Sequence, residues 1–266
     1  MTAIAADHVR AVPVIHRVPL VRVVKVELRK MFDTRSGFWL IASIAISAVL
    51  ATGGVILWAP DDQLTYSTFA TAIRFPVVII LPLIAILAVT SEWSERTGLT
   101  TFTLIPHRSR IITAKAISAI LIAVAAMVLT FAVGALGNLL SAAVTGTTLV
   151  WDVTLTQCLY YVLGMILSLL TGFMLGVLIR SSTGAIVAYF ILTFVLPTIF
   201  GLLSESQRWF HDLQPWIDIQ FAQSGLFVFD QALTGEQWSN IAVTGITWLL
   251  IPLAIGLGFV MRAEVK

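Results

Sequence analysis

The stretch SEWSERTGLTTFTLIPHRSRIITAK, residues 91–115, is a polar interruption between two long apolar segments. It holds six of the thirty Asp, Glu, Lys and Arg residues in a 266-residue chain that is 58% hydrophobic. A segment this polar has to face water, because each unpaired charge or backbone group in hydrocarbon costs several kcal/mol. We therefore predict a water-facing loop at residues 91–115, with membrane-embedded segments on either side.

The composition of the whole chain agrees with this reading. Only 11% of the residues are charged, the mean hydropathy is +0.96, and several apolar runs reach about 20 residues, the length that spans a bilayer as a helix. The prediction is an all-α polytopic membrane protein. Its six transmembrane helices are expected at about residues 38–58, 71–90, 117–140, 155–179, 184–203 and 241–261.

Residues 1–37 are predicted to form a tail followed by an amphipathic helix. One face of residues 20–35 is apolar (Leu20, Val21, Val24, Leu28, Met31, Phe32), the opposite face is mainly basic, and Glu27 fits the pattern imperfectly. Such a helix before a first span favours a position in the headgroup plane, with its cations near anionic lipid. A short cytosolic helix packed on its own protein is the alternative.

The fourth predicted span carries small residues every four positions, at Gly164, Ser168, Gly172 and Gly176. In a membrane such a stripe lets another helix approach closely, so we predict a helix-packing surface. The sequence leaves open whether the partner is a helix of this chain or of a second subunit.

Two polar residues lie inside predicted spans. Arg74 is near the outer end of the second span, where an arginine can extend to the headgroups or line a substrate cavity. Asn138 is near the end of the third span, and a hydrogen bond to a neighbouring helix is the simpler expectation.

Residues 204–240 are too apolar for a free loop and too interrupted by polar residues for a span. We predict short amphipathic helices at the outer membrane interface before the last span. Five aromatic residues of this segment are candidate functional residues: Trp209, Phe210, Trp216, Phe227 and Phe229.

Basic residues give the orientation. Fourteen of the sixteen Lys and Arg residues fall on the side that holds both termini, residues 91–115 and Arg180. The positive-inside rule makes this side cytoplasmic. We therefore expect a multi-pass protein of the cell membrane, with both termini and residues 262–266 in the cytoplasm.

Several functions are disfavoured by missing motifs. The spans carry no acid or cation pair typical of proton or sodium coupling, and the chain has no G-x-x-x-x-G-K-[ST] phosphate loop, no H-E-x-x-H and no G-x-S-x-G. We expect no catalytic residues, no metal site, no cofactor in this chain and no nucleic-acid partner. A transporter driven by a separate ATPase fits these features, whereas a stand-alone carrier, an immunity-type binding protein or an intramembrane enzyme remain alternatives.

The ordered features resemble the permease subunits of bacterial type 2 ABC exporters, the ABC-2 family, over nearly the whole chain. The shared elements are the basic amphipathic N-terminal helix, six spans, a cytosolic loop after span two and an amphipathic outer segment before span six. Within the loop the resemblance rests on Glu92 and Trp93, then Thr97 and Gly98, which reverse the family's usual Gly-Thr order, then Pro106, Arg108 or Arg110, and Lys115.

The resemblance implies two permeases, identical or homologous, paired with two copies of a cytosolic ATPase that binds ATP and Mg. A helix within residues 91–105 would dock on the ATPase, and residues 204–240 with the five selected aromatic residues would form an extracellular gate. An amphipathic or lipid-like drug, antibiotic, peptide or glycolipid would move outward. The residues implied in coupling are Glu92, Trp93, Glu95, Arg96, Thr97, Gly98, Pro106, Arg108, Arg110 and Lys115. The alternative for Glu92, Arg96 and Arg110 is that they are solvated loop charges.

Overall fold

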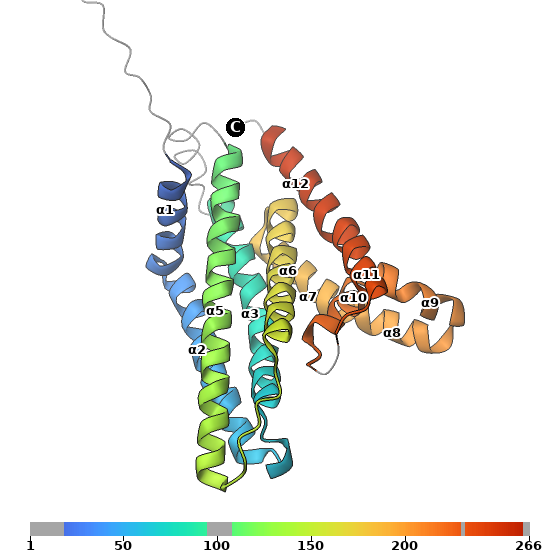
Figure 1. Ribbon diagram of the computed structural model, residues 1–266. Helices are drawn as coiled ribbons and strands as arrows, with labels where there is room; N and C mark the ends of the chain where they lie inside the picture. Colours follow the sequence, from blue (N-terminus) through green and yellow to red (C-terminus); the bar gives the residue numbers. More distant parts are fainter. Residues whose placement is uncertain (1–18, 95–107, 230–231, 263–266) are drawn as a thin grey trace, which may run out of the picture.

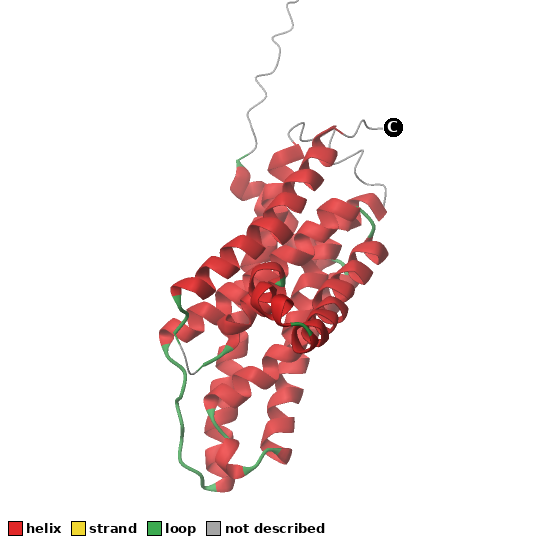
Figure 2. Ribbon diagram, turned by 90° about the vertical axis from the view of Figure 1, so that its right-hand side faces the viewer, coloured by secondary structure: helices red, strands yellow, loops and turns green. Residues whose placement is uncertain are grey.

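The computed structural model describes residues 19–94, 108–229 and 232–262. Within these ranges the chain is helical with short loops and no strand (Figure 2), and six helical segments are long and apolar enough to cross a membrane. The prediction of an all-α fold with six candidate spans is confirmed. The six segments are Gly37–Trp58, Tyr66–Ser91, Ser109–Thr145, Leu155–Ile179, Ser182–Ser206 and Gly235–Arg262.

The first half of the chain forms an upright bundle (Figure 1). Its elements are α1 (Leu20–Asp33), α2 (Arg35–Trp58), η1 (Asp61–Gln63), α3 (Tyr66–Ser94), α5 (Arg108–Thr145) and α6 (Leu155–Ile179).

The second half begins behind α6, extends to one side of the bundle and returns to it (Figure 1). Two of its segments, η2 and η4, are π-helical turns inside the last two spans. Its elements are α7 (Ser182–Phe190), η2 (Ile191–Val195), α8 (Leu196–Ser206), α9 (Arg208–Ile217), α10 (Ile219–Ser224), η3 (Gly225–Phe227), α11 (Gly235–Gly245), η4 (Ile246–Leu250) and α12 (Ile251–Arg262).

The helices around the predicted loop are longer than the sequence suggested. The α3 helix continues to Ser94 and α5 begins at Arg108, so both ends of the segment 91–115 are helical. Charged residues do not break a helix, and α5, with 38 residues, measures about 57 Å against a hydrocarbon thickness of about 30 Å. Its charged first turns can therefore lie outside the hydrocarbon without ending the helix.

The last span also begins earlier than predicted, at Gly235 instead of about residue 241. Thr234 caps this helix, because its side chain accepts a hydrogen bond from the Gln237 N–H while the Gln237 side chain accepts one from the Thr234 N–H. Residues 235–240 thus belong to the final span and not to the outer segment.

The small-residue stripe of α6 lies against elements of the same chain. A Cβ added to Gly172 would lie 2.6 Å from the Pro82 carbonyl oxygen of α3, and one added to Gly176 would lie 3.3 Å from the Ile86 oxygen. At Gly164 the neighbour is the Phe227 ring, at 2.5 Å. Glycine therefore allows α6 to approach α3 closely and makes room for one aromatic ring of the outer segment.

The α1 helix packs on its own protein, and its inward face overlaps the expected apolar face only in part, at Leu28 and Met31. Val23, Glu27 and Met31 are buried, whereas Val21, assigned to the apolar face, is 79% exposed. The buried face contacts α5 and α2. The difference arises because the inward face includes a charged residue, Glu27, which a hydrophobicity plot assigns to the outside.

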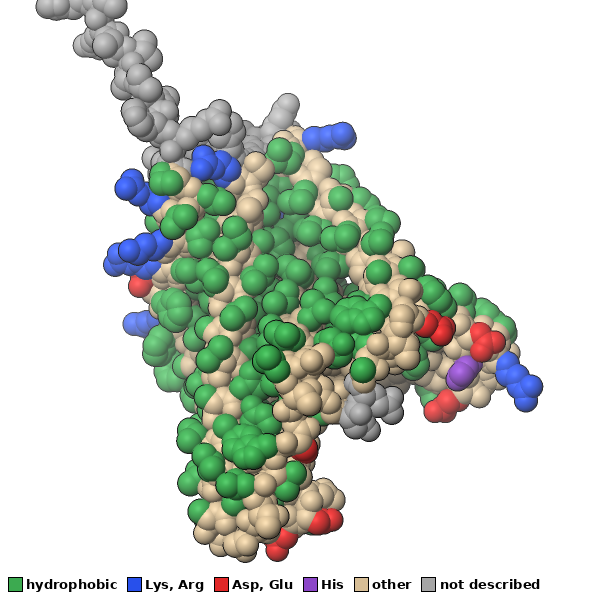
Figure 3. All heavy atoms as spheres, in the orientation of Figure 1, with side chains coloured by type: hydrophobic (Ala, Val, Ile, Leu, Met, Phe, Trp, Pro, Cys, Tyr) green, Lys and Arg blue, Asp and Glu red, His purple; other side chains and the backbone are tan. Residues whose placement is uncertain are grey.

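Charges separate along the molecule (Figure 3). Lys and Arg side chains gather over α1 and at the free end of α12, while most Asp and Glu side chains lie at the opposite end of the bundle and around α8 and α9. An apolar belt covers the region between these two groups, as expected for a protein that crosses a bilayer.

Candidate functional site

A buried ion pair joins three helices near the residues 95–107. Lys115 of α5 donates a hydrogen bond to Oε2 of Glu27 on α1 at 2.8 Å and another to the Ala88 carbonyl oxygen of α3 at 2.8 Å. The side chains of Lys115 and Glu27 are each 5% exposed. Lys30 of α1 donates to the other Glu27 oxygen at 2.8 Å. Both carboxylate oxygens are thus occupied, as a buried charge requires.

The environment of Glu27 keeps it ionised. Burial of the carboxyl group raises its pKa, but the charges and hydrogen bonds of Lys115 and Lys30 outweigh burial and hold the pKa below its ordinary value. Glu27 is therefore a carboxylate at neutral pH, and α1 is bound to α5 by a full charge pair.

Neutral hydrogen bonds extend this contact. The Ser118 hydroxyl of α5 donates to the Val24 carbonyl oxygen of α1 at 3.2 Å, one helical turn from the ion pair. On α3, the Thr90 hydroxyl lies 2.7 Å from the Ser182 hydroxyl at the start of α7. The helices α1, α3, α5 and α7 are thus linked by polar contacts near the end of the bundle where α3 ends and α5 begins.

The structure places the residues of the predicted coupling set as follows. Glu92 and Trp93 lie in the last turn of α3, and Arg108 is the first residue of α5; the structure describes the backbone of these three. Arg110 is half-buried in the first turn of α5, and Lys115 is buried one turn further. The members that lie outside the described residues are Glu95, Arg96, Thr97, Gly98 and Pro106.

Two aromatic residues that follow α10, Phe227 and Phe229, pack on the bundle. Phe227 of η3 and Phe229 surround Tyr161 of α6, with ring centroids 5.7 and 5.9 Å from that of Tyr161. The Arg74 guanidinium of α3 lies 4.8 Å from the centroid of Phe227. Arg74 therefore points at an aromatic ring inside the protein, in cation–π geometry, and its Nε has no hydrogen-bond partner among the described residues.

The other predicted gate residues lie elsewhere. Trp209 and Phe210 of α9 contact each other, and Phe210 packs on Phe200 of α8 at a centroid distance of 5.5 Å. Trp216, at the end of α9, is half-buried. The five aromatic residues are thus divided between the α8–α9 hairpin and the Tyr161 contact, and do not form one cluster.

Asn138 and the α6 stripe have local roles. The Asn138 amide donates to the Val150 carbonyl oxygen in the loop after α5, at 3.0 Å, so its partner is a loop and not another helix. Ser168 of α6 lies 3.4 Å from the Tyr189 hydroxyl of α7. Among the described residues, no group of three or more His, Cys, Asp or Glu side chains could hold a metal ion.

Sequence reasoning missed the partner of Lys115. The available signal was a single acid on the apolar side of a basic amphipathic helix, because an acid there needs a cation from another element. It also missed Gln223 of α10, which is buried beside Ser168 and Tyr189.

Comparison with known proteins agrees with these features. A family model described as "ABC-2 family transporter protein" matches residues 23–198, which include most of α1, the ion pair, the α6 stripe and most of the fifth span. No curated protein matches the sequence.

Proposed function

Because the chain belongs to the ABC-2 family of membrane transport proteins, we propose that it is the permease of an ATP-binding cassette exporter that moves an amphipathic or lipid-like substrate outward. ATP and Mg would be bound by a separate cytosolic ATPase, present in two copies. A second permease, identical or homologous, would complete the transporter.

The observation that carries the proposal is the Lys115 contact. Lys115 ties α1 and α3 to α5 immediately beside residues 95–107, which connect α3 to α5. A force applied to this segment would reach three helices through one buried group. This arrangement suits a permease whose energy comes from a partner docked on residues 91–105.

The charge distribution supports the orientation. Lys and Arg gather at the end that holds α1, the start of α5 and the end of α12, which would place residues 95–107 and both termini in the cytoplasm of the cell. The ATPase would then meet this end of the bundle, and α8 and α9 would face the outside.

The fifth span offers a surface for a second permease. Within Ser182–Ser206, 6% of an 18-residue apolar stretch is buried in the chain, compared with 61% of such a stretch in α6. Its exposed side chains are apolar, among them Phe190, Phe194 and Ile199. Such a face suits contact with lipid or with a second permease. We place the contact of the proposed dimer on this face.

The experiment measures ATP turnover. The chain is purified from native membranes, the co-purifying ATPase is identified, and the complex is placed in nanodiscs. Glu92→Lys and Arg96→Glu should each lower ATP turnover several-fold, because they reverse charges in the proposed docking segment. Asp61→Lys, a charge reversal in exposed η1 at the other end of the bundle, is the matched control and should leave turnover unchanged.

Two results would contradict the proposal. One is purification from native membranes without any ATPase, which would favour a stand-alone carrier or an immunity-type binding protein. The other is equal turnover in the docking variants and the control.

A further inference from the structure

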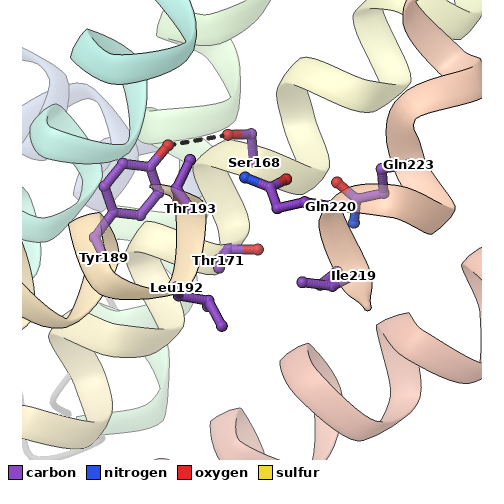
Figure 4. A pocket seen from close by; sticks show the side chains of 8 residues that line it. All are labelled: Ser168, Thr171, Tyr189, Leu192, Thr193, Ile219, Gln220 and Gln223. Atoms are coloured by element: carbon purple, nitrogen blue, oxygen red, sulfur yellow. Dashed lines mark hydrogen bonds between the residues drawn. The ribbon is translucent and has the colours of Figure 1, made fainter. Parts of the chain in front are cut away.

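A small cavity lies between α6, the α7–η2 junction and α10 (Figure 4). It is partly open, and its enclosed space has room for about one water-sized group, far too little for a whole drug-sized ligand. It therefore suits one polar group of a larger molecule. The eight lining residues are uncharged: Ser168, Thr171, Tyr189, Leu192, Thr193, Ile219, Gln220 and Gln223.

Gln223 supplies unused hydrogen-bond donors to this cavity. Its side chain is 3% exposed, and Nε2 has no hydrogen-bond partner among the described residues. Figure 4 shows its amide group extending from α10 toward Gln220 and the interior of the cavity. A buried polar group left without a partner is unfavourable, so the two N–H bonds favour a ligand that accepts hydrogen bonds.

The hydroxyl groups on the opposite wall offer acceptors. Thr171 donates its proton to the Leu167 carbonyl oxygen at 2.9 Å, and Tyr189 donates its proton to the Val78 carbonyl oxygen at 2.8 Å. Because the Tyr189 proton is used in this way, the Ser168 hydroxyl donates to Tyr189. The oxygens of Ser168 and Thr171 therefore present lone pairs to the cavity.

This arrangement selects by chemistry. A hydroxyl group can accept from Gln223 or Gln220 and donate to a hydroxyl or amide oxygen of the lining, so it can satisfy both kinds of partner. A carboxylate has no proton to donate, and an ammonium group has no lone pair to accept. No charged side chain lines the cavity to compensate either ion.

The cavity also lies where the spans depart from regular helix. The π-helical turn η2 supplies Leu192 and Thr193 to its wall. The second π-helical turn, η4, holds the residues before α10, because Trp248 Nε1 donates to the Ile217 carbonyl oxygen at 2.7 Å. Single π turns inside α-helices are frequent at functional sites.

We propose that this cavity is a binding subsite for a hydroxyl group of an uncharged amphiphile, such as the glycerol or sugar headgroup of a neutral lipid. The inference rests on the proposed transport of an amphipathic substrate and narrows its class to neutral, hydroxyl-bearing molecules. A free polyol carries the same hydroxyl group, so the test includes it.

The test is photolabelling of the permease in phosphatidylcholine nanodiscs without nucleotide. The probe is a monoacylglycerol with a diazirine on the acyl carbon next to the ester, and labelled peptides are mapped by mass spectrometry. We expect saturable labelling of α6, the α7–η2 junction or α10. Excess unlabelled monoolein should compete, whereas oleate and glycerol at the same concentration should not.

Variants assign the labelling to the cavity. Gln223→Leu keeps the size of the side chain and removes its donors, so labelling should fall about fivefold, the effect of losing one hydrogen bond. Gln207→Leu, at an exposed glutamine of the same outer segment, is the matched control and should label like wild type. Thr171→Val removes one acceptor with little change of shape and provides a second measurement if Gln223→Leu folds poorly.

Three results would overturn the inference. They are the absence of saturable labelling in wild type, equal labelling of wild type, Gln223→Leu and Thr171→Val, and equal competition by oleate or glycerol. Since no nucleotide or ATPase is present, each of them would leave the ATP turnover experiment unaffected.

Discussion

Nζ of Lys115 and Oε2 of Glu27 lie 2.8 Å apart although the two residues are 88 positions apart in the sequence. Both side chains are buried, so the pair contributes little net stability compared with apolar residues of the same size. Breaking it is different, because the remaining charge stays buried. This asymmetry makes the pair testable by substitution.

Lys115→Met should destabilise the protein by about 1–3 kcal/mol, because one oxygen of Glu27 would lose its buried partner while Lys30 still pairs with the other. The measurement is the melting temperature of the purified protein in detergent. The double variant Glu27→Met with Lys115→Met should recover most of the loss. Arg29→Ala breaks the exposed Arg29–Asp33 pair and should leave the melting temperature unchanged. Equal changes of the melting temperature in Lys115→Met and Arg29→Ala would contradict the burial of the Lys115–Glu27 pair.

The Glu27 carboxylate should also make stability depend on pH. Its pKa in the folded protein is below the ordinary value of 4.5, so its contribution is complete above pH 4.5 and is lost as the pH falls through the lower folded value. Wild type should therefore melt above Glu27→Gln at pH 7, and the difference should shrink below pH 4.5. A difference that grows on acidification would contradict the ionised state of Glu27.

Glycine substitutions on α6 should differ according to what faces each site. Gly172→Ala places a methyl group 2.6 Å from the Pro82 backbone, which cannot move away easily, and we expect a loss of about 1–3 kcal/mol. Gly176→Ala, at 3.3 Å from Ile86, should cost less. Gly201→Ala meets nothing within 4 Å and serves as the control. The order of the melting temperatures tests the close approach of α6 and α3.

Cysteine labelling tests the orientation of the chain. Cys158 is the single cysteine, so Cys158→Ser provides a background for new labelling sites. In intact cells, Asp61→Cys should react with a membrane-impermeant maleimide, whereas Thr100→Cys should react only after the cells are opened. Reaction of Thr100→Cys in intact cells would contradict the proposed orientation and, with it, the proposed coupling to a cytosolic ATPase.

The sequence was sufficient for the number of spans, because runs of about 20 apolar residues in water have no stable alternative to burial in a membrane. It was less informative about where helices end. Glu92 and Arg108 lie inside α3 and α5, since a helix that leaves the hydrocarbon can continue into water. Hydropathy locates the membrane boundary and not the helix end.

Side-chain contacts between segments far apart in the sequence could not be predicted from the hydrophobic periodicity of each segment. Glu27 looked misplaced on α1 because its partner, Lys115, comes from a helix that begins 75 residues after α1 ends. Arg74 looked like a residue that reaches for the headgroups, yet Phe227 of the outer segment lies beside it. Such contacts depend on tertiary packing, which periodicity does not encode.

The length of α5 has a consequence for how the two sides of the membrane communicate. Lys115 lies toward the end of α5 that begins at Arg108, and toward the other end Asn138 is bonded to Val150, whose carbonyl oxygen also accepts from the backbone N–H of Tyr66 on α3 at 3.2 Å. In a rigid rod of about 57 Å, a tilt of about 5° displaces one end by about 5 Å relative to the other. An inclination imposed at the Lys115 end would thus reappear as a lateral shift of the α5–α6 loop, without any change inside the helix.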